Sequence, residues 1–286
     1  MRALVLSGGG SKGAYEVGAL KYLIGDLGIN YDIFAGVSIG AINAAYLAQF
    51  KDTKTAIVPL EKLWDGLDSS KVYKHWWFPY VAAIWKASLY DSSPAQRLVR
   101  GEISPNLIRN SGKKLRIGAT GLDTGEYRVF DETYPDICGA VLASSAFPGM
   151  LTPVELEGQL WTDGGVKSTT PLKAAIEAGA TTIDVVLCSP AGDASTAFST
   201  KTTALGVGVR AISLMSDQIE AADLEICGMV NKLVVAGAAR PGQIVVDLRI
   251  IRPNNGLVKN PLDFTPSLLA SMKVQGYTDA KEQFKL

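Results

Sequence analysis

A serine in this sequence stands where a reactive hydroxyl could be presented. Residues 36–40 read Gly-Val-Ser-Ile-Gly, a G-x-S-x-G pattern that follows an apolar run expected to be a strand (33–37) and precedes a helical run. This order predicts a sharp strand-to-helix turn with the hydroxyl of Ser38 exposed at its tip. Gly36 and Gly40 would let the neighbouring backbones pass closely. Ser38 is therefore a candidate nucleophile.

A serine nucleophile needs a base, and the usual histidine is not offered. The only histidine, His75, lies well before the late position at which α/β-hydrolases place theirs. Asp163 follows an apolar run and precedes Gly164 and Gly165, so we expect a carboxylate on a tight turn. Within reach of Ser38 it can take the hydroxyl proton, and partial burial would raise its basicity. The alternative is an Asx turn in which the carboxylate only caps the bend.

A glycine-rich loop, Ser-Gly-Gly-Gly-Ser-Lys-Gly at residues 7–13, joins the first expected strand to the first expected helix. A P-loop is excluded because Ala14, not lysine, follows the last glycine. A dinucleotide fingerprint fits the glycine spacing, but Asp32, at the distance of the ribose-binding acid, stands before the next strand and not at its end. A tight turn and an oxyanion hole remain, and the presence of Ser38 favours the oxyanion hole. Lys12 is either a solvated charge or a contact for a phosphate head group.

Apolar strands alternate with helical patterns along the chain, which predicts an α/β fold: a three-layer α/β/α sandwich with a mostly parallel central sheet. We expect one domain over 1–286, with an aromatic helical insertion at about 65–110. The helical pattern at 204–233 carries a broad apolar stripe, which we expect to face the core with its acids opposite. The expected strands are 2–7, 33–37, 115–120, 128–130, 183–188 and 244–251. The other expected helices are 13–27, 41–49, 135–144, 171–178 and 266–284.

Composition excludes several classes of protein. With 28 basic and 28 acidic residues the net charge is zero, which gives no support to nucleic-acid binding. Three scattered cysteines make neither a disulfide framework nor a metal pattern, so we expect buried thiols and no metal or cofactor. The sequence shows neither a signal peptide nor a run of about 20 apolar residues, so we expect a cytoplasmic protein.

An aromatic cluster between residues 73 and 90 is the strongest sign of a membrane partner. It includes Trp76, Trp77 and Phe78, and tryptophan favours the membrane–water interface. The cluster is interpreted as a lid or a peripheral membrane contact, or alternatively as a helical cap that packs into the core. The small and polar segment 191–203 is expected to be an exposed loop, and the sequence leaves open whether it gates the site.

These motifs, in this order, resemble the patatin-like phospholipase family. The similarity lies in the glycine loop (8–13), the serine turn (36–40), the Asp-Gly-Gly segment (163–165) and the segment Ala-Ser-Ser-Ala-Phe-Pro-Gly (143–149). The family often has an asparagine about four residues after Asp-Gly-Gly, where this chain has Thr169. That departure concerns how the turn is braced.

The resemblance implies a Ser-Asp dyad of Ser38 and Asp163 on an α/β/α sandwich, without calcium. It also implies an oxyanion hole from the backbone of Gly8, Gly9, Gly10 and Ser11. The expected function is lipid acyl hydrolysis, of the phospholipase A or lysophospholipase type, on a glycerolipid or phospholipid. The alternatives are an acyltransferase of the malonyl-transfer type, which normally uses a later histidine, a nucleotide-binding domain that uses the glycine loop, and a lipid-binding module with a silent dyad.

Overall fold

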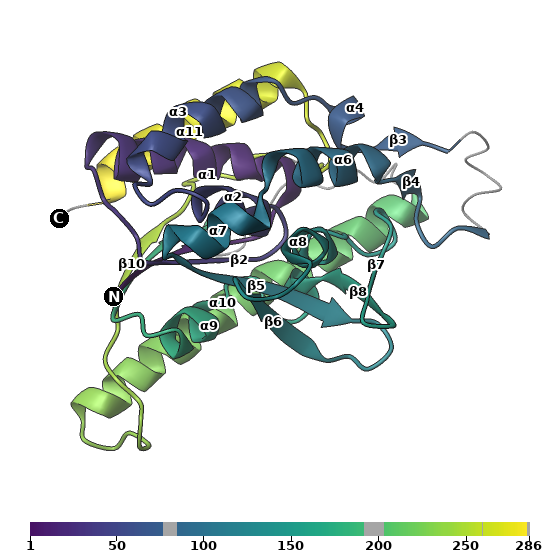
Figure 1. Cartoon of the computed structure of the whole chain (residues 1–286). Helices are drawn as coiled ribbons and strands as arrows, with labels where there is room; N and C mark the ends of the chain where they lie inside the picture. The colour runs from purple at the N-terminus through teal and green to yellow at the C-terminus, as the bar shows by residue number, and fades with distance from the viewer. Residues whose placement is uncertain (77–84, 192–202, 259, 285–286) are drawn as a thin grey trace.

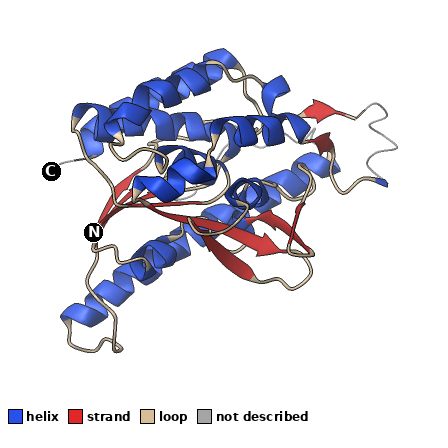
Figure 2. Ribbon diagram, viewed as in Figure 1, coloured by secondary structure: helices blue, strands red, loops and turns tan. Residues whose placement is uncertain are grey.

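The computed structural model describes residues 1–76, 85–191, 203–258 and 260–284 of the chain. An eight-stranded sheet forms its centre, and helices cover both faces (Figures 1 and 2). Neighbouring strands run parallel in the order β10-β9-β1-β2-β5. Their bounds are β1 Arg2–Leu6, β2 Ile33–Gly36, β5 Lys114–Gly121, β9 Thr182–Val186 and β10 Asp247–Ile251. The expected α/β fold with a mostly parallel sheet is confirmed.

Burial on both faces explains why the parallel strands were readable in the sequence. In β1, Leu4 and Leu6 belong to the larger hydrophobic core on one face, while Ala3 and Val5 belong to the smaller core on the other. All four side chains are fully buried. A strand covered on both faces reads as a continuous apolar run and not as an alternating one.

Three antiparallel strands extend the sheet beyond the parallel set. They are β6 Tyr127–Asp131, β7 Val154–Leu156 and β8 Gln159–Asp163. The hairpin of β7 and β8 was not expected from the sequence. These strands are short, and Glu155 and Gln159 interrupt their apolar pattern. The hairpin matters because β8 ends at the candidate base, Asp163.

Helices pack on the two faces of the sheet in separate layers (Figure 1). The larger core is covered by α1 Gly13–Leu20 with a π-helical continuation Lys21–Asp26, α2 Ile39–Leu47, α3 Lys54–Asp65, α8 Ile137–Ser144 and α11 Pro266–Gln283. The smaller core is covered by α9 Leu172–Glu177 and α10 Ala204–Val235. Helices α1 and α11 approach so closely that a Cβ on Gly18 or Gly276 would clash with the backbone of the other helix.

The aromatic segment at about 65–110 joins the edge of this sandwich. It holds α4 Ser69–Val72, β3 Lys74–His75, β4 Tyr90–Asp91, α6 Ser93–Glu102 and α7 Pro105–Ser111. Trp76 donates from Nε1 to the carbonyl of Ser88 at 3.1 Å. Trp77 and Phe78 lie outside the described residues, as does most of the loop 191–203. Their roles in membrane contact and gating stay predictions.

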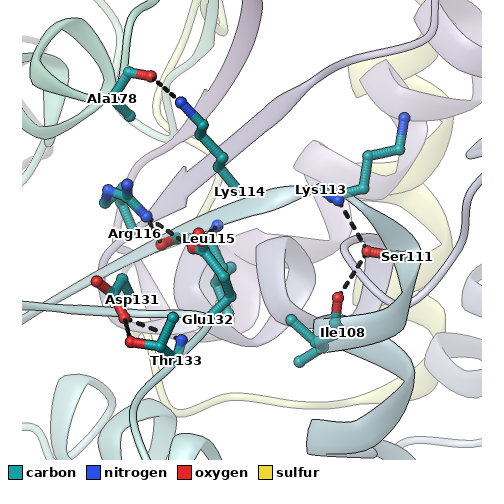
Figure 3. Close-up of polar contacts among 10 residues, drawn as sticks. All are labelled: Ile108, Ser111, Lys113, Lys114, Leu115, Arg116, Asp131, Glu132, Thr133 and Ala178. Carbon is teal, nitrogen blue, oxygen red and sulfur yellow. Dashed lines mark hydrogen bonds and ion pairs between the residues drawn. The ribbon is translucent and has the colours of Figure 1, made fainter.

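Polar contacts anchor the start of β5, the strand on which the site is built (Figure 3). Lys114 donates from Nζ to the carbonyl of Ala178 at 2.7 Å. Arg116 pairs with Glu132 at 2.7 Å, and Glu132 also accepts from the backbone N–H of Leu115 at 2.8 Å. These bonds tie the start of β5 to the end of α9 and to the residue that follows β6.

Helix α10 departs in part from the expectation from its sequence. Two of its acids face the protein: Glu220 is buried, and Asp223 accepts from Ser168 Oγ at 3.1 Å. Large apolar residues such as Met215 and Ile226 are exposed instead. The expected core-facing stripe is therefore only partly correct, because Val209 packs against the larger core and Ile212 lines the cavity described below. The apolar periodicity predicts a helix here, but it does not reveal which side of the helix packs against the rest of the protein.

Two smaller expectations concern the cysteines and membrane spans. Cys138, Cys188 and Cys227 are all buried free thiols, as expected. Within the described part of the chain, no helix is both long enough and apolar enough to cross a bilayer.

Candidate active site

Ser38 occupies the turn between β2 and α2 in a strained conformation. Its φ of 57° and ψ of −129° are unusual for a residue with a side chain and cost about 1–3 kcal/mol. The flanking glycines make the turn possible. A Cβ on Gly36 would clash with the carbonyl of Gly40, and a Cβ on Gly40 would lie 2.5 Å from the carbonyls of Leu6 and Ser7. The glycines thus have the close-packing role expected of them.

Two serines at the end of α8 hold the backbone of Ser38. The Oγ of Ser144 accepts from the N–H of Ser38 at 3.0 Å, and the Oγ of Ser145 donates to the carbonyl of Ser38 at 3.0 Å. Both serines belong to the segment 143–149 that carried part of the resemblance. Hydrogen bonds to both the N–H and the carbonyl of Ser38 hold the two peptide groups that flank its Cα, and so stabilise a conformation that is otherwise unfavourable.

Asp163 ends β8 and is almost completely buried, with 4% of its surface exposed. Its Oδ1 accepts from the N–H of Gly165 at 2.8 Å, so one carboxylate oxygen caps the bend as in an Asx turn. Its Oδ2 has no hydrogen-bond partner among the described residues. Burial raises the pKa of Asp163 to about 6, although the nearby Ser38 hydroxyl and the N–H of Gly165 partly oppose the shift. A carboxyl with this pKa is a stronger base than an ordinary aspartate.

The pairing of β5 explains how two distant residues meet. Strand β6 pairs with β5 across positions that β2 and β8 also use, so β2 and β8 must share the opposite edge of β5. On that edge Gly36 lies opposite Ile117 and Asp163 lies opposite Ala119. Because β8 runs antiparallel to β2, the carboxyl ends of the two strands point toward each other. Gly164 fits here only without a side chain, since a Cβ would clash with the carbonyl of Gly118.

The glycine loop lies against the serine turn. A Cβ on Gly8 would stand 3.0 Å from the Cβ of Ser38 and 3.7 Å from its Oγ. The backbone N–H groups of Gly8, Gly9 and Gly10 have no hydrogen-bond partner among the described residues, whereas that of Ser11 donates to the carbonyl of Pro261 at 2.7 Å. Ser11 is therefore not free to act as an oxyanion donor. Among the described residues, the N–H groups of Gly8, Gly9 and Gly10 remain available to donate.

Pro261 is a part of this site that the sequence did not indicate. Gly10 has a φ of 59°, and a Cβ at that position would clash with the Pro261 carbonyl. The loop between β10 and α11 thus presses on the glycine loop and sets its shape. No short motif marks Pro261, because its role depends on a contact between residues 250 positions apart.

One open cavity of about 1220 Å³, which includes solvent at its mouth, contains all these groups. Ser38, Asp163 and the three glycines line it, and most of the rest of its wall is apolar. A second cavity of about 530 Å³ is almost entirely apolar. Residues lining both are Ile39, Ile42, Val72, Ala95 and Phe264. The two cavities therefore adjoin.

Helix α10 supplies a polar wall that the sequence reasoning missed. Ser213, Ser216 and Asp217 line the larger cavity near Lys12 and Ser189. Asp217 accepts from the Oγ of Ser189 at 2.8 Å. Thr169, the departure from the family pattern, donates from Oγ1 to the carbonyl of Ser216 at 3.3 Å and so links the aspartate turn to α10.

His75 lies apart from the described wall of this cavity. It belongs to β3, is exposed, and packs edge-on against Tyr90 at 5.2 Å between ring centroids. The described wall around Ser38 and Asp163 therefore offers no imidazole, and its ionisable side chains are those of Lys12, Asp163 and Asp217.

The chain belongs to the patatin-like phospholipase family, whose sequence pattern matches residues 4–176. An uncharacterized NTE family protein of Mycobacterium tuberculosis, MT2641, is 30% identical over 168 residues, which span 59% of this chain but only 27% of that protein. The uncharacterized protein R571 of Acanthamoeba polyphaga mimivirus is 29% identical over 183 residues, 60% of each chain. The crystal structure of VipD from Legionella pneumophila shares the fold, with a TM-score of 0.53 at 17% identity over 99% of this chain and 66% of VipD.

Proposed function

We propose that this chain is a serine hydrolase that cleaves carboxylic esters of lipids. The observation that carries the proposal is the pairing of Ser38 with a buried carboxylate, Asp163, in one apolar cavity beside three unpartnered N–H groups. These are the three parts that acyl transfer needs: a nucleophile, a base and donors for the oxyanion.

In the proposed first step, the Oγ of Ser38 attacks the ester carbonyl carbon while Asp163 takes its proton. The N–H groups of Gly8, Gly9 and Gly10 donate to the negative oxygen of the tetrahedral intermediate, a contribution worth about 2.7–4 kcal/mol for each effective donor. The C–O bond to the leaving alcohol then breaks, and protonated Asp163 returns the proton to that alcohol. Water repeats the sequence on the acyl-enzyme, with Asp163 again as base.

The shape of the site supports a lipid substrate. The apolar second cavity adjoins the wall of the first through Ile42 and Phe264, and it offers a place for an acyl chain. The polar wall is suited to the alcohol side of the ester, and Lys12 on it offers a positive charge to a phosphate-bearing head group. The substrate class inferred is a glycerolipid or phospholipid.

The malonyl-transfer alternative is disfavoured by the position of His75, which belongs to β3 and lies apart from the described wall of the cavity. The nucleotide-binding alternative is disfavoured because it gives no joint role to Ser38 and Asp163, which line the same cavity as the glycine loop. Family membership also supports the hydrolase proposal.

The test is hydrolysis of a chromogenic medium-chain ester by the wild type, Ser38→Ala and Asp163→Asn. We expect both variants to lose at least about a thousandfold in kcat/KM, with unchanged circular dichroism. Ser168→Ala is a matched control, because it changes a polar contact near the same turn without touching the dyad. Full activity of Ser38→Ala or Asp163→Asn would refute the proposal.

A further inference from the structure

Helix α10 carries an apolar stripe on the side that faces away from the protein. Its inward side holds buried Glu220 and Cys227. At 3.6 residues per turn, six of the exposed large apolar residues project within about a third of the helix circumference, whereas Val235 (77% exposed) projects outside it. The six are Val207 (51% exposed), Leu214 (47%), Met215 (62%), Ile226 (55%), Met229 (49%) and Leu233 (46%). We call this set the outer stripe.

The C-terminal end of α10 projects from the body of the protein (Figure 1). No heavy atom lies within 4 Å of the position that a Cβ on Gly228 would occupy, so the helix backbone is open there. The outer stripe falls into two groups, at residues 207–215 and 226–233, and each group is more than the scattered exposure of ordinary surfaces. We therefore expect a binding partner to cover the outer stripe.

Charges beside the outer stripe indicate the occupant. In the described second half of α10, the exposed charged residues are Glu225 and Lys232. They are seven positions apart, two helical turns, and therefore lie on the same flank of the stripe. Their signs are opposite.

We propose that the outer stripe binds the same helix of a second copy of this chain, antiparallel and related by a twofold axis near residues 228 and 229. In that arrangement Glu225 of each copy lies level with Lys232 of the other, which gives two ion pairs at once. Met229 meets the open backbone at Gly228. A twofold interface requires such self-complementarity, and flanking charges of this kind set helix orientation in coiled coils.

Other pairings fit the charges less well. A parallel pair in register would place Glu225 against Glu225 and Lys232 against Lys232, which is repulsive. A lipid surface is expected to be met by a helix with lysine and arginine along the flanks of its apolar face. Here Glu225 is an exposed acid, and the described second half of α10 offers Lys232 alone as an exposed base.

A single helix pair buries less than the roughly 1,200–2,000 Å² of a standard interface, so the dimer is expected to be weak and reversible. We expect sedimentation velocity to show a monomer at about 1 µM and a dimer at about 100 µM. Met229→Lys should remain monomeric at the higher concentration. Val274→Lys is the matched control, because Val274 is 68% exposed on α11 and far from the outer stripe.

Charge reversal tests the orientation. Glu225→Lys alone and Lys232→Glu alone should each weaken dimerisation at least tenfold, and the double reversal should restore it. The proposal is overturned if the wild type stays monomeric at about 100 µM, or if the double reversal is as weak as the single variants. Flotation of the wild type with phosphatidylcholine vesicles, lost in Met229→Lys without any dimer, would assign the outer stripe to lipid and also overturn it.

Discussion

Gly36 and Asp163 end two strands that run toward each other along one edge of β5, where they pair with Ile117 and Ala119. Ser38 follows Gly36 by two residues, so the turn after β2 and the end of β8 share one wall of the cavity. The alignment brings a hydroxyl and a carboxylate together although most of the sheet runs parallel and β8 does not.

Activity should depend on pH through Asp163. Burial raises the pKa of Asp163 to about 6, and the carboxyl must be ionised to accept the proton of Ser38. We expect kcat/KM to be level above about pH 7 and to fall tenfold per pH unit below about pH 6. A profile measured with an uncharged ester checks this. An inflection near pH 4, where an ordinary aspartate titrates, would contradict it.

Stability should change in the opposite sense to activity. Because the pKa of Asp163 is raised from 3.8 to about 6 on folding, the folded state binds the proton more tightly, and the free energy of unfolding decreases as pH rises between these values. Asp163→Asn removes this penalty. We expect the variant to be more stable at pH 7 by about 1–3 kcal/mol and nearly inactive. Urea denaturation of the wild type and of Asp163→Asn at pH 4 and pH 7 measures the difference. If the substitution changes the free energy of unfolding equally at both pH values, the raised pKa of Asp163 is contradicted.

The contact between Gly10 and Pro261 should control the oxyanion loop. Gly10→Ala adds a Cβ that clashes with the Pro261 carbonyl, so we expect kcat to fall about a hundredfold. Gly112→Ala is the matched control. Its φ of 77° is equally left-handed, but no heavy atom lies within 4 Å of the new Cβ. That control should lose about 1 kcal/mol of stability and keep its kcat. Similar kcat values for the two variants would show that the contact is unimportant.

Ser144 should matter for the rate through the backbone of Ser38. Ser144→Ala removes the acceptor of the Ser38 N–H, and we expect kcat to fall about tenfold with KM little changed. Ser111→Ala removes a buried hydroxyl that donates to the Ile108 carbonyl at 2.7 Å, away from the cavity. It should lose comparable stability at full kcat. Steady-state kinetics on both variants distinguish positioning of Ser38 from general stability.

Ala95 should set the preferred acyl length. It lines both cavities, and Ala95→Phe would narrow the passage from one to the other. We expect kcat/KM for a C12 ester to fall more than about tenfold while that for a C4 ester stays within about twofold. Equal reductions for both esters would mean that the acyl chain does not enter the second cavity.

Local constraints explain what the sequence could predict. The turn at Ser38 needs glycines on both sides because a Cβ there would clash with the neighbouring backbone, and Asp163 is followed by two glycines in its own turn. Both positions are therefore predictable from short motifs. The parallel strands were readable because they are buried on both faces.

Long-range contacts explain what the sequence could not predict. The edge of β5 that joins β2 to β8 depends on the register of three strands. The sequence predicts Ser11 as an oxyanion donor, but its N–H donates to the carbonyl of Pro261, a residue far away along the chain. In α10 the periodicity predicts an apolar stripe. Only the burial of Glu220 and the contact of Asp223 with Ser168 show that these two acids face inward.

Covalent labelling of the wild type with an alkyl fluorophosphonate, followed by peptide mass spectrometry, tests the central claim most directly. The phosphonyl group should appear on Ser38 alone. The labelling rate should fall at least about a hundredfold in Asp163→Asn, because the buried carboxylate no longer takes the hydroxyl proton. Labelling at another residue, or an unchanged rate in Asp163→Asn, would contradict a Ser38–Asp163 dyad.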